Sequence, residues 1–158
     1  MDNPLAILTC FWRSRRPSLI RNMPAMRNNF WLRQGYDAMT FFGTIITATQ
    51  EEAERINNKN NILKNHEMIH LRQAQSLHDS WLLFYLRYGW YSLLALPQCR
   101  YMKDGAYLLN PFELEAYRHE EEMDYLQKHE ATEWRKWAQL KPAERREKFY
   151  PQYNKKTK

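Results

Sequence analysis

The stretch His66-Glu67-Met68-Ile69-His70 has the form H-E-x-x-H, and the interpretation of the whole chain starts from it. On an α-helix, residues four positions apart lie on one face, so both imidazoles can reach a single metal ion. Glu67 follows the first histidine, where a carboxylate can act as general base beside that metal. The pattern predicts a zinc site if the helix faces inward and a third ligand follows downstream.

A helix is predicted from about residue 62 to residue 80, with Asn60 or Asn61 as its N-cap. Its inward face is predicted from residues that recur at helical spacing: Ile62, His66, Ile69, His70, Gln73 and Leu77. A single inward histidine is usually an ordinary core residue. Two histidines on one apolar stripe with a glutamate between them favour a metal site instead.

Periodicity elsewhere predicts an α+β protein that is mostly helical, and 158 residues fit one domain. Residues 36–47 are rich in aromatic and β-branched types and predict a strand or a hairpin arm. Gly43 within that stretch indicates a bulge or a close backbone approach. Residues 98–109 are predicted to be a loop, and further helices are predicted at 81–96, 110–126, 132–140 and 142–150.

Charge and composition divide the chain into a basic, partly ordered N-terminal arm (1–34), a central domain (35–150) and a basic tail (151–158). The net charge of +6 is concentrated at the ends, so nucleic-acid binding is disfavoured. The two cysteines, Cys10 and Cys99, are far apart and predict neither a disulfide framework nor a thiolate metal site. No signal peptide is recognised, and a cytoplasmic location is expected.

Residues 81–96 are apolar on almost every side of the predicted helix. Such a helix is either buried or associated with a membrane surface. Its length and the central Arg87 argue against a membrane span. We favour a buried helix, and peripheral membrane association through 81–96 is the alternative.

Glu113 and Glu115 are both candidates for the third metal ligand. They lie two positions apart on a predicted helix, so only one of them can reach the metal. Asn110-x-x-Glu113 also has the form of a capping box, which is a purely structural role for Glu113. On a helical wheel, Glu115 lies nearer than Glu113 to the stripe of Phe112, Ala116, His119 and Met123. Periodicity alone therefore favours Glu115.

Together with the first motif, Glu113-Leu114-Glu115-Ala116-Tyr117 resembles the gluzincin pattern of H-E-x-x-H followed by E-x-x-A-D. The resemblance implies that Glu113 binds zinc with His66 and His70. Tyr117 stands where gluzincins usually have an aspartate that supports a zinc-bound histidine, so that supporting bond is in question here.

The longer runs at 65–73 and 110–117 also resemble a family of small, uncharacterised bacterial zincin-like proteins, over about residues 36–138. This resemblance implies a zincin-like catalytic domain in which a small N-terminal sheet or hairpin packs on the H-E-x-x-H helix. In zincins an edge strand before that helix binds extended peptide, and Met39–Thr47 has this place in the chain.

The implied function is that of a gluzincin-like zinc metallopeptidase, a hydrolase that acts on a peptide or protein substrate with Zn²⁺ as cofactor and Glu67 as general base. A donor to the developing oxyanion is also required, and the candidates are Tyr117, His119 and a tyrosine from 81–91. Two alternatives stay open. One is a zinc-binding interaction module without catalysis, and the other is a basic binder of membrane surfaces or nucleic acid in which the motif is incidental.

Overall fold

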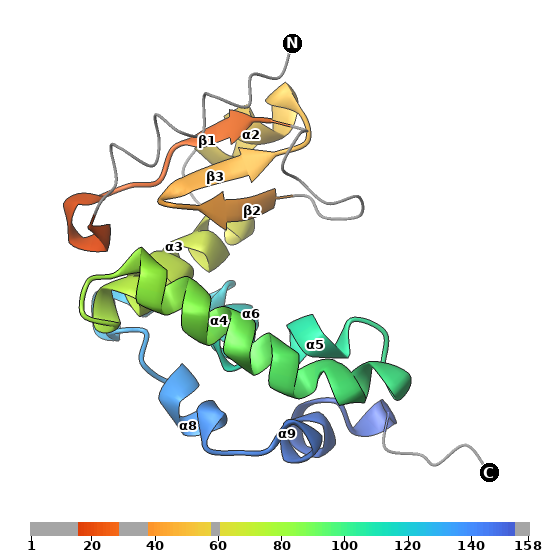
Figure 1. The fold of residues 1–158 in the computed structure, drawn as a ribbon. Coiled ribbons are helices and arrows are strands. Elements are labelled where there is room, and N and C mark those ends of the chain that lie inside the picture. The colour runs from red at the N-terminus through yellow and green to blue at the C-terminus, as the bar shows by residue number, and fades with distance from the viewer. Residues whose placement is uncertain (1–15, 29–37, 58–60, 154–158) are drawn as a thin grey trace.

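The computed structural model describes residues 16–28, 38–57 and 61–153. Within these ranges a small sheet lies at one end and helices form most of the remainder, which confirms the prediction of a mostly helical α+β protein (Figure 1). The strands are β1 (Ala25–Arg27), β2 (Ala38–Phe41) and β3 (Thr44–Thr47). The helices are α2 (Gln50–Asn57), α3 (Ile62–Ser76), α4 (Trp81–Ala95), α5 (Gly105–Leu108), α6 (Pro111–His119), α7 (Tyr125–Lys128), α8 (Trp134–Ala138) and α9 (Pro142–Phe149). Short 3-10 turns are η1 (Pro17–Leu19), η2 (Leu96–Arg100) and η3 (Pro151–Tyr153).

The sheet has the strand order β1-β3-β2, with β1 parallel and β2 antiparallel to β3. A two-residue turn joins β2 to β3. Its residues, Phe42 and Gly43, have φ values of 45° and 83°. Positive φ at both positions is the signature of a type I′ turn, whose twist matches that of a hairpin. The predicted hairpin is therefore present, and Gly43 serves its turn rather than a bulge.

Strand β1 comes from the segment that composition assigned to an irregular arm. It pairs with β3, and Met23 just before it is fully buried. The Asn57 side chain bonds both the N–H and the C=O of Ala25, which satisfies the outer edge of this strand. Three residues of the type Ala-Met-Arg carry no strand signal of their own. The remainder of the predicted arm, 1–15 and 29–34, and residues 154–158 of the predicted tail lie outside the described residues.

Helix α3 carries the motif through the middle of the molecule. Asn61 caps it, accepting a hydrogen bond from the Lys64 N–H at 3.1 Å, and the helix ends at Ser76 rather than near residue 80. The predicted inward stripe is buried except for Ile62 at the first turn, which is exposed. The main core joins the sheet, α2, α3, α4, α6 and α8 through Met23, Ile45, Ile56, Leu71, Ala74, Trp81, Phe84, Phe112 and Trp134.

Helix α6 begins where the sequence predicts. The Asn110 side chain accepts the Phe112 N–H and donates to the Tyr88 carbonyl, so it caps α6 and fixes its start against α4. The predicted continuous helix 110–126 is wrong, because α6 ends at His119 and α7 is separate. The Asn65 side chain donates to the carbonyls of His119, Glu120 and Glu122, which caps the end of α6 from α3. The predicted loop 98–109 contains helix α5 and part of η2.

Helix α4 differs from the favoured prediction of a buried helix. Only Trp81, Phe84 and Ala95 are buried on it, and several large apolar side chains are exposed. Among the described residues, no helix has the length and apolar character needed to cross a bilayer.

Candidate metal centre

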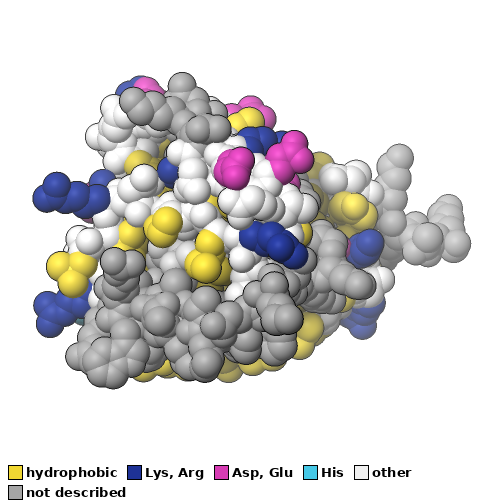
Figure 2. All heavy atoms as spheres, turned by 90° about the horizontal axis from the view of Figure 1, so that it is seen from above, with side chains coloured by type: hydrophobic (Ala, Val, Ile, Leu, Met, Phe, Trp, Pro, Cys, Tyr) yellow, Lys and Arg dark blue, Asp and Glu magenta, His cyan; other side chains and the backbone are white. Residues whose placement is uncertain are grey.

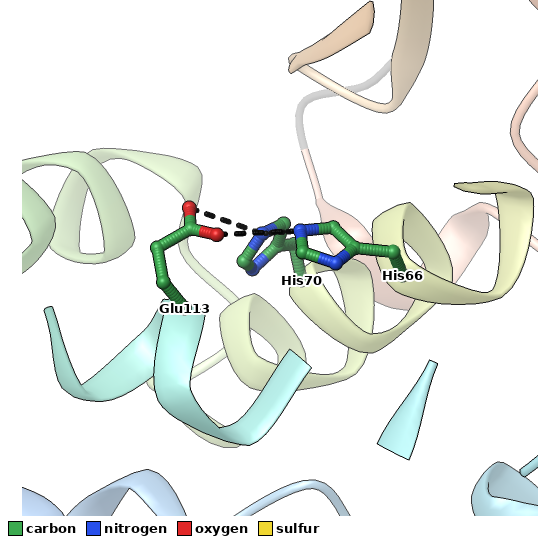
Figure 3. A group of neighbouring side chains, drawn as sticks. All are labelled: His66, His70 and Glu113. Carbon is green, nitrogen blue, oxygen red and sulfur yellow. Dashed lines mark hydrogen bonds and ion pairs between the residues drawn. The ribbon is translucent and has the colours of Figure 1, made fainter. Parts of the chain in front are cut away.

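Three buried side chains from two helices meet at one point below the sheet. His66 and His70 project from α3 and Glu113 projects from α6, and the three point toward one another (Figure 3). The Nε2 atoms of the two histidines are 3.2 Å apart. Glu113 Oε2 is 3.3 Å from His66 Nε2, and Glu113 Oε1 is 3.4 Å from His70 Nε2. The group predicted from the two motifs is therefore assembled in the fold.

The two contacts of Glu113 involve different carboxylate oxygens, and one ligand atom from each of the three residues lies within 4.8 Å of the others. A zinc ion bonds nitrogen and carboxylate oxygen at about 2.0–2.2 Å, so neighbouring ligand atoms in a tetrahedral site lie about 3.3 Å apart. Three ligands at this spacing leave the fourth corner of the tetrahedron for a water molecule or a substrate atom. Two imidazoles and one carboxylate are thus a donor set that could hold a metal ion.

Each imidazole is oriented through its other nitrogen. The Nδ1–H of His66 donates to Glu120 Oε2 at 2.8 Å, and the Nδ1–H of His70 donates to Gln73 Oε1 at 2.8 Å. These bonds select the tautomer that leaves the Nε2 lone pair toward the shared point. Glu120 lies seven residues after Glu113, which is two helical turns later on the same face. Its carboxylate makes the supporting bond to His66, for which Tyr117 has no carboxylate.

Glu115 belongs to a different network. Its Oε1 accepts bonds from the Tyr125 hydroxyl and the Glu133 N–H, both at 2.8 Å. Its Oε2 accepts from Gln73 Nε2 at 2.9 Å and from the Trp134 N–H at 3.3 Å. Because Gln73 Nε2 faces this carboxylate, the Gln73 carbonyl must face His70. Periodicity placed Glu115 correctly as a buried residue, but Glu113 is the one beside the histidines.

One oxygen of Glu113 has no donor. The Tyr88 hydroxyl donates to Oε1 at 2.6 Å, whereas the buried Oε2 has no hydrogen-bond partner among the described residues. An unpaired buried carboxylate oxygen is costly unless a cation neutralises it. This oxygen is also the Glu113 atom that lies beside His66 Nε2, at 3.3 Å.

In the absence of a metal ion, the charges of the carboxylates and the imidazoles at this group stabilise one another. Burial lowers the pKa of His66, but the carboxylates of Glu113 and Glu120 outweigh it and raise that pKa to about 10. Burial raises the pKa of Glu113, but the two imidazoles outweigh it and hold that pKa well below its ordinary value. The buried carboxylate is thus stable in its charged form when positive charge occupies the space in front of it.

Glu67 lies next to this group, in the wall of a cavity of about 320 Å³. The Thr40 hydroxyl of β2 donates to Glu67 Oε2, which orients the carboxylate from the sheet side. The other walls are formed by β2 and by the aromatic side chains Phe84, Tyr85, Tyr88 and Tyr107. The cavity therefore brings together the candidate base, the candidate metal ligands and an apolar surface.

The two predicted accessory residues have different positions. The Tyr117 ring packs edge-on against His66 with centroids 4.7 Å apart, and its hydroxyl lies 3.1 Å from that of Tyr107. His119 is not beside the metal ligands, because its ring nitrogens bond Glu122 at 3.0 Å and Glu133 at 2.8 Å. The proposal of His119 as oxyanion donor is therefore corrected.

Four residues of the site were not identified from sequence as site residues: Asn65, Gln73, Tyr107 and Glu120. Gln73 was assigned to the inward stripe without a role, and the i+7 spacing from Glu113 was a usable signal for Glu120. Tyr107 carried no signal, since it lies in a segment predicted to be a loop.

We expect Glu120→Gln to weaken zinc binding by about 10–100-fold, because the bond to His66 Nδ1 loses its charge. Competition with a chromophoric chelator measures this affinity. Glu122→Gln is the matched control, since Glu122 bonds His119 and is half exposed. Equal affinities for wild type and Glu120→Gln would contradict the supporting role of Glu120.

Comparison of the chain with protein-family models, curated proteins and solved structures gave no match. The family resemblance therefore rests on the two motifs alone.

Proposed function

We propose that this protein is a zinc-dependent hydrolase of the gluzincin-like type that cleaves peptide bonds. The observation that carries the proposal is the arrangement of His66, His70 and Glu113, whose facing atoms lie 3.2–3.4 Å apart. Glu67 beside the same cavity supports a catalytic use of the site rather than a structural one.

A zinc ion bound by these three residues would supply Lewis acidity, lowering the pKa of a water molecule and polarising a substrate carbonyl. Glu67 then acts as general base, taking a proton from the attacking water and returning it to the leaving amine. Thr40 holds the Glu67 carboxylate in place for both transfers. Tyr88 and Glu120 keep Glu113 and His66 oriented throughout.

The developing oxyanion needs a neutral donor, and Tyr107 is the best placed tyrosine. It lines the cavity, and its hydroxyl lies beside that of Tyr117. Burial and the nearby Glu113 raise the pKa of Tyr107, so the hydroxyl keeps its proton at neutral pH. The hydroxyl of Tyr88 already donates to Glu113, and that of Tyr85 bonds the backbone of β2.

Strand β2 provides a place for extended peptide. It stands at the end of the sheet order and has one neighbouring strand among the described residues. Ala38, Met39 and Thr40 of this strand line the cavity next to Glu67. A peptide that pairs with this edge by main-chain hydrogen bonds would cross in front of the metal centre.

Zinc analysis and a cleavage assay test this proposal together. We expect one zinc per chain and new peptide termini when the protein is incubated with a proteome-derived peptide mixture and the products are identified by mass spectrometry. A chelator should stop cleavage, and stoichiometric zinc should restore it. Zinc binding without cleavage of any peptide would contradict the hydrolase proposal, and a protein that binds no added zinc would contradict the site itself.

A further inference from the structure

The exposed face of α4 is a feature of the described residues that the proposed function does not use. Four side chains at helical spacing form its centre, with exposed fractions of 66%, 61%, 59% and 60% for Leu82, Leu86, Trp90 and Leu93. Leu83, Leu94, Leu96 and Tyr101 extend it. We call these eight side chains the α4 stripe.

The four central side chains of the α4 stripe follow one face of the helix, at spacings of 4, 4 and 3 residues. Single exposed apolar residues are normal, whereas a contiguous apolar patch marks an interaction site. Figure 2 shows hydrophobic side chains along the lower margin of the molecule, which is the front of the view in Figure 1, where α4 lies. Gly89 lies within the same face, and a side chain there would meet no atom within 4 Å. The packing of the described residues therefore does not require this glycine.

The segment 80–103, which carries the α4 stripe, contains charged residues of one sign only. No Asp or Glu occurs between Asp79 and Asp104, whereas Arg87, Arg100 and Lys103 lie in that interval.

Of these cations, Arg87 follows Leu86 of the stripe on α4, and Arg100 contacts a ring of the stripe. The guanidinium groups of Arg87 and Arg135 lie 5.9 Å and 5.5 Å from the ring centroid of Trp134, which is buried and outside the stripe. At the C-terminal end, those of Arg100 and Arg146 lie 4.6 Å and 4.3 Å from the Tyr101 ring. Long basic side chains at the edge of an apolar face can reach anionic groups while their stems stay on that face.

We propose that the α4 stripe binds the surface of an anionic phospholipid bilayer, with α4 lying in the interface. Leucine and tryptophan enter the boundary between headgroups and acyl chains, and the bordering arginines meet lipid phosphates. Charge selects this occupant over a second copy of the chain. Self-contact through α4 would bring the cationic borders of two copies together without a carboxylate in 80–103 to pair with them.

The proposed lipid surface and the cavity are on opposite faces of α4. Phe84, Tyr85 and Tyr88 line the cavity, and the α4 stripe projects away from them. Membrane binding therefore leaves the cavity uncovered, about one helix diameter (~10–12 Å) from the lipid. Substitutions in the stripe consequently leave the proposed catalytic residues untouched, so this inference can fail independently of the proposed function.

Vesicle co-sedimentation of the full chain tests the inference. We expect binding to vesicles of phosphatidylcholine with phosphatidylserine, weaker binding to phosphatidylcholine alone, and loss of binding as salt rises. The double variant Leu86→Gln/Trp90→Gln should lower the partition coefficient by at least about tenfold. Leu19→Gln is the matched control, since Leu19 is 71% exposed on η1, and it should bind as wild type does.

A second variant separates the contribution of charge to vesicle binding from the contribution of the apolar stripe. Arg87→Gln keeps the apolar stripe and should reduce binding to anionic vesicles only. Unchanged far-UV circular dichroism and zinc content verify that each variant is folded. Equal binding by the double variant and wild type, equal binding to neutral and anionic vesicles, or no binding would each overturn the inference. A lipid-free dimer that the double variant abolishes would also overturn it, because the stripe would then be a contact between copies.

Discussion

Replacing Glu67 with glutamine is expected to reduce peptide hydrolysis by about 10²–10⁴-fold while one zinc per chain is retained. The amide is close to the carboxylate in size, but it cannot accept a proton from water at neutral pH. Glu67 is not one of the three residues whose ligand atoms converge, so zinc binding should not depend on it. The Thr40 hydroxyl can still donate to the amide oxygen, so the side chain should keep its orientation.

The experiment compares kcat/KM, zinc content and thermal unfolding for wild type, Glu67→Gln and Glu51→Gln. Glu51 is an exposed glutamate on α2 and serves as the matched control. Full activity of Glu67→Gln would rule out its role as the base. Loss of zinc from Glu67→Gln would show that the carboxylate binds the metal, and the assignment of ligands would then have to change.

The same glutamate-to-glutamine change is expected to act in opposite ways at Glu113 and Glu115. At Glu113 the amide nitrogen can replace Oε2, which has no hydrogen-bond donor and lies beside His66 Nε2, so zinc is lost and the fold persists. At Glu115 one end of the amide must present N–H groups to the N–H of Trp134 and to Gln73 Nε2. Two donors that face each other in a buried site should lower the free energy of unfolding by roughly 3 kcal/mol, because neither finds an acceptor.

Thermal unfolding and metal analysis separate the two effects. For a chain of this size, roughly 3 kcal/mol corresponds to a fall in Tm of about 6–12 °C for Glu115→Gln, and the fall should persist in chelator-treated protein. Glu113→Gln should keep the Tm of the chelator-treated wild type and bind no zinc. A Glu115→Gln protein with wild-type stability and no zinc would make Glu115 the ligand instead.

The contrast between Glu113 and Glu115 also shows how far sequence reasoning reached. Helical periodicity placed Glu115 nearer the apolar stripe and so favoured it as the ligand, whereas the resemblance to gluzincins indicated Glu113, the residue that lies beside the histidines. A wheel projection gives the direction of a side chain from its own helix, but not which neighbouring element lies in that direction. Gln73, Tyr125 and the start of α8 surround Glu115, and the histidines face Glu113.

Helix α4 shows a similar limit. An apolar composition predicts burial when the rest of the chain is large enough to cover the helix. Here the neighbouring helices cover one face, through Trp81, Phe84 and Ala95, and leave the α4 stripe exposed. Composition alone cannot distinguish a helix that its own chain covers on both faces from a helix that keeps one apolar face exposed. Both are made of the same apolar residues.

The sequence by itself determined the local features of this protein: the α3 helix with two histidines on one face, an asparagine cap at Asn60 or Asn61, the Asn110-Pro111 start of α6, and extended structure within 36–47. Each depends on interactions within a few residues, which spacing and residue type express directly. Only the tertiary structure decided that Glu113 meets the histidines, that Glu120 and Gln73 orient them, and that β1 joins the sheet. Apart from the Gln73–His70 bond, which spans three residues, those contacts join residues 20 to 54 positions apart in the chain, and packing free energy rather than local preference selects them.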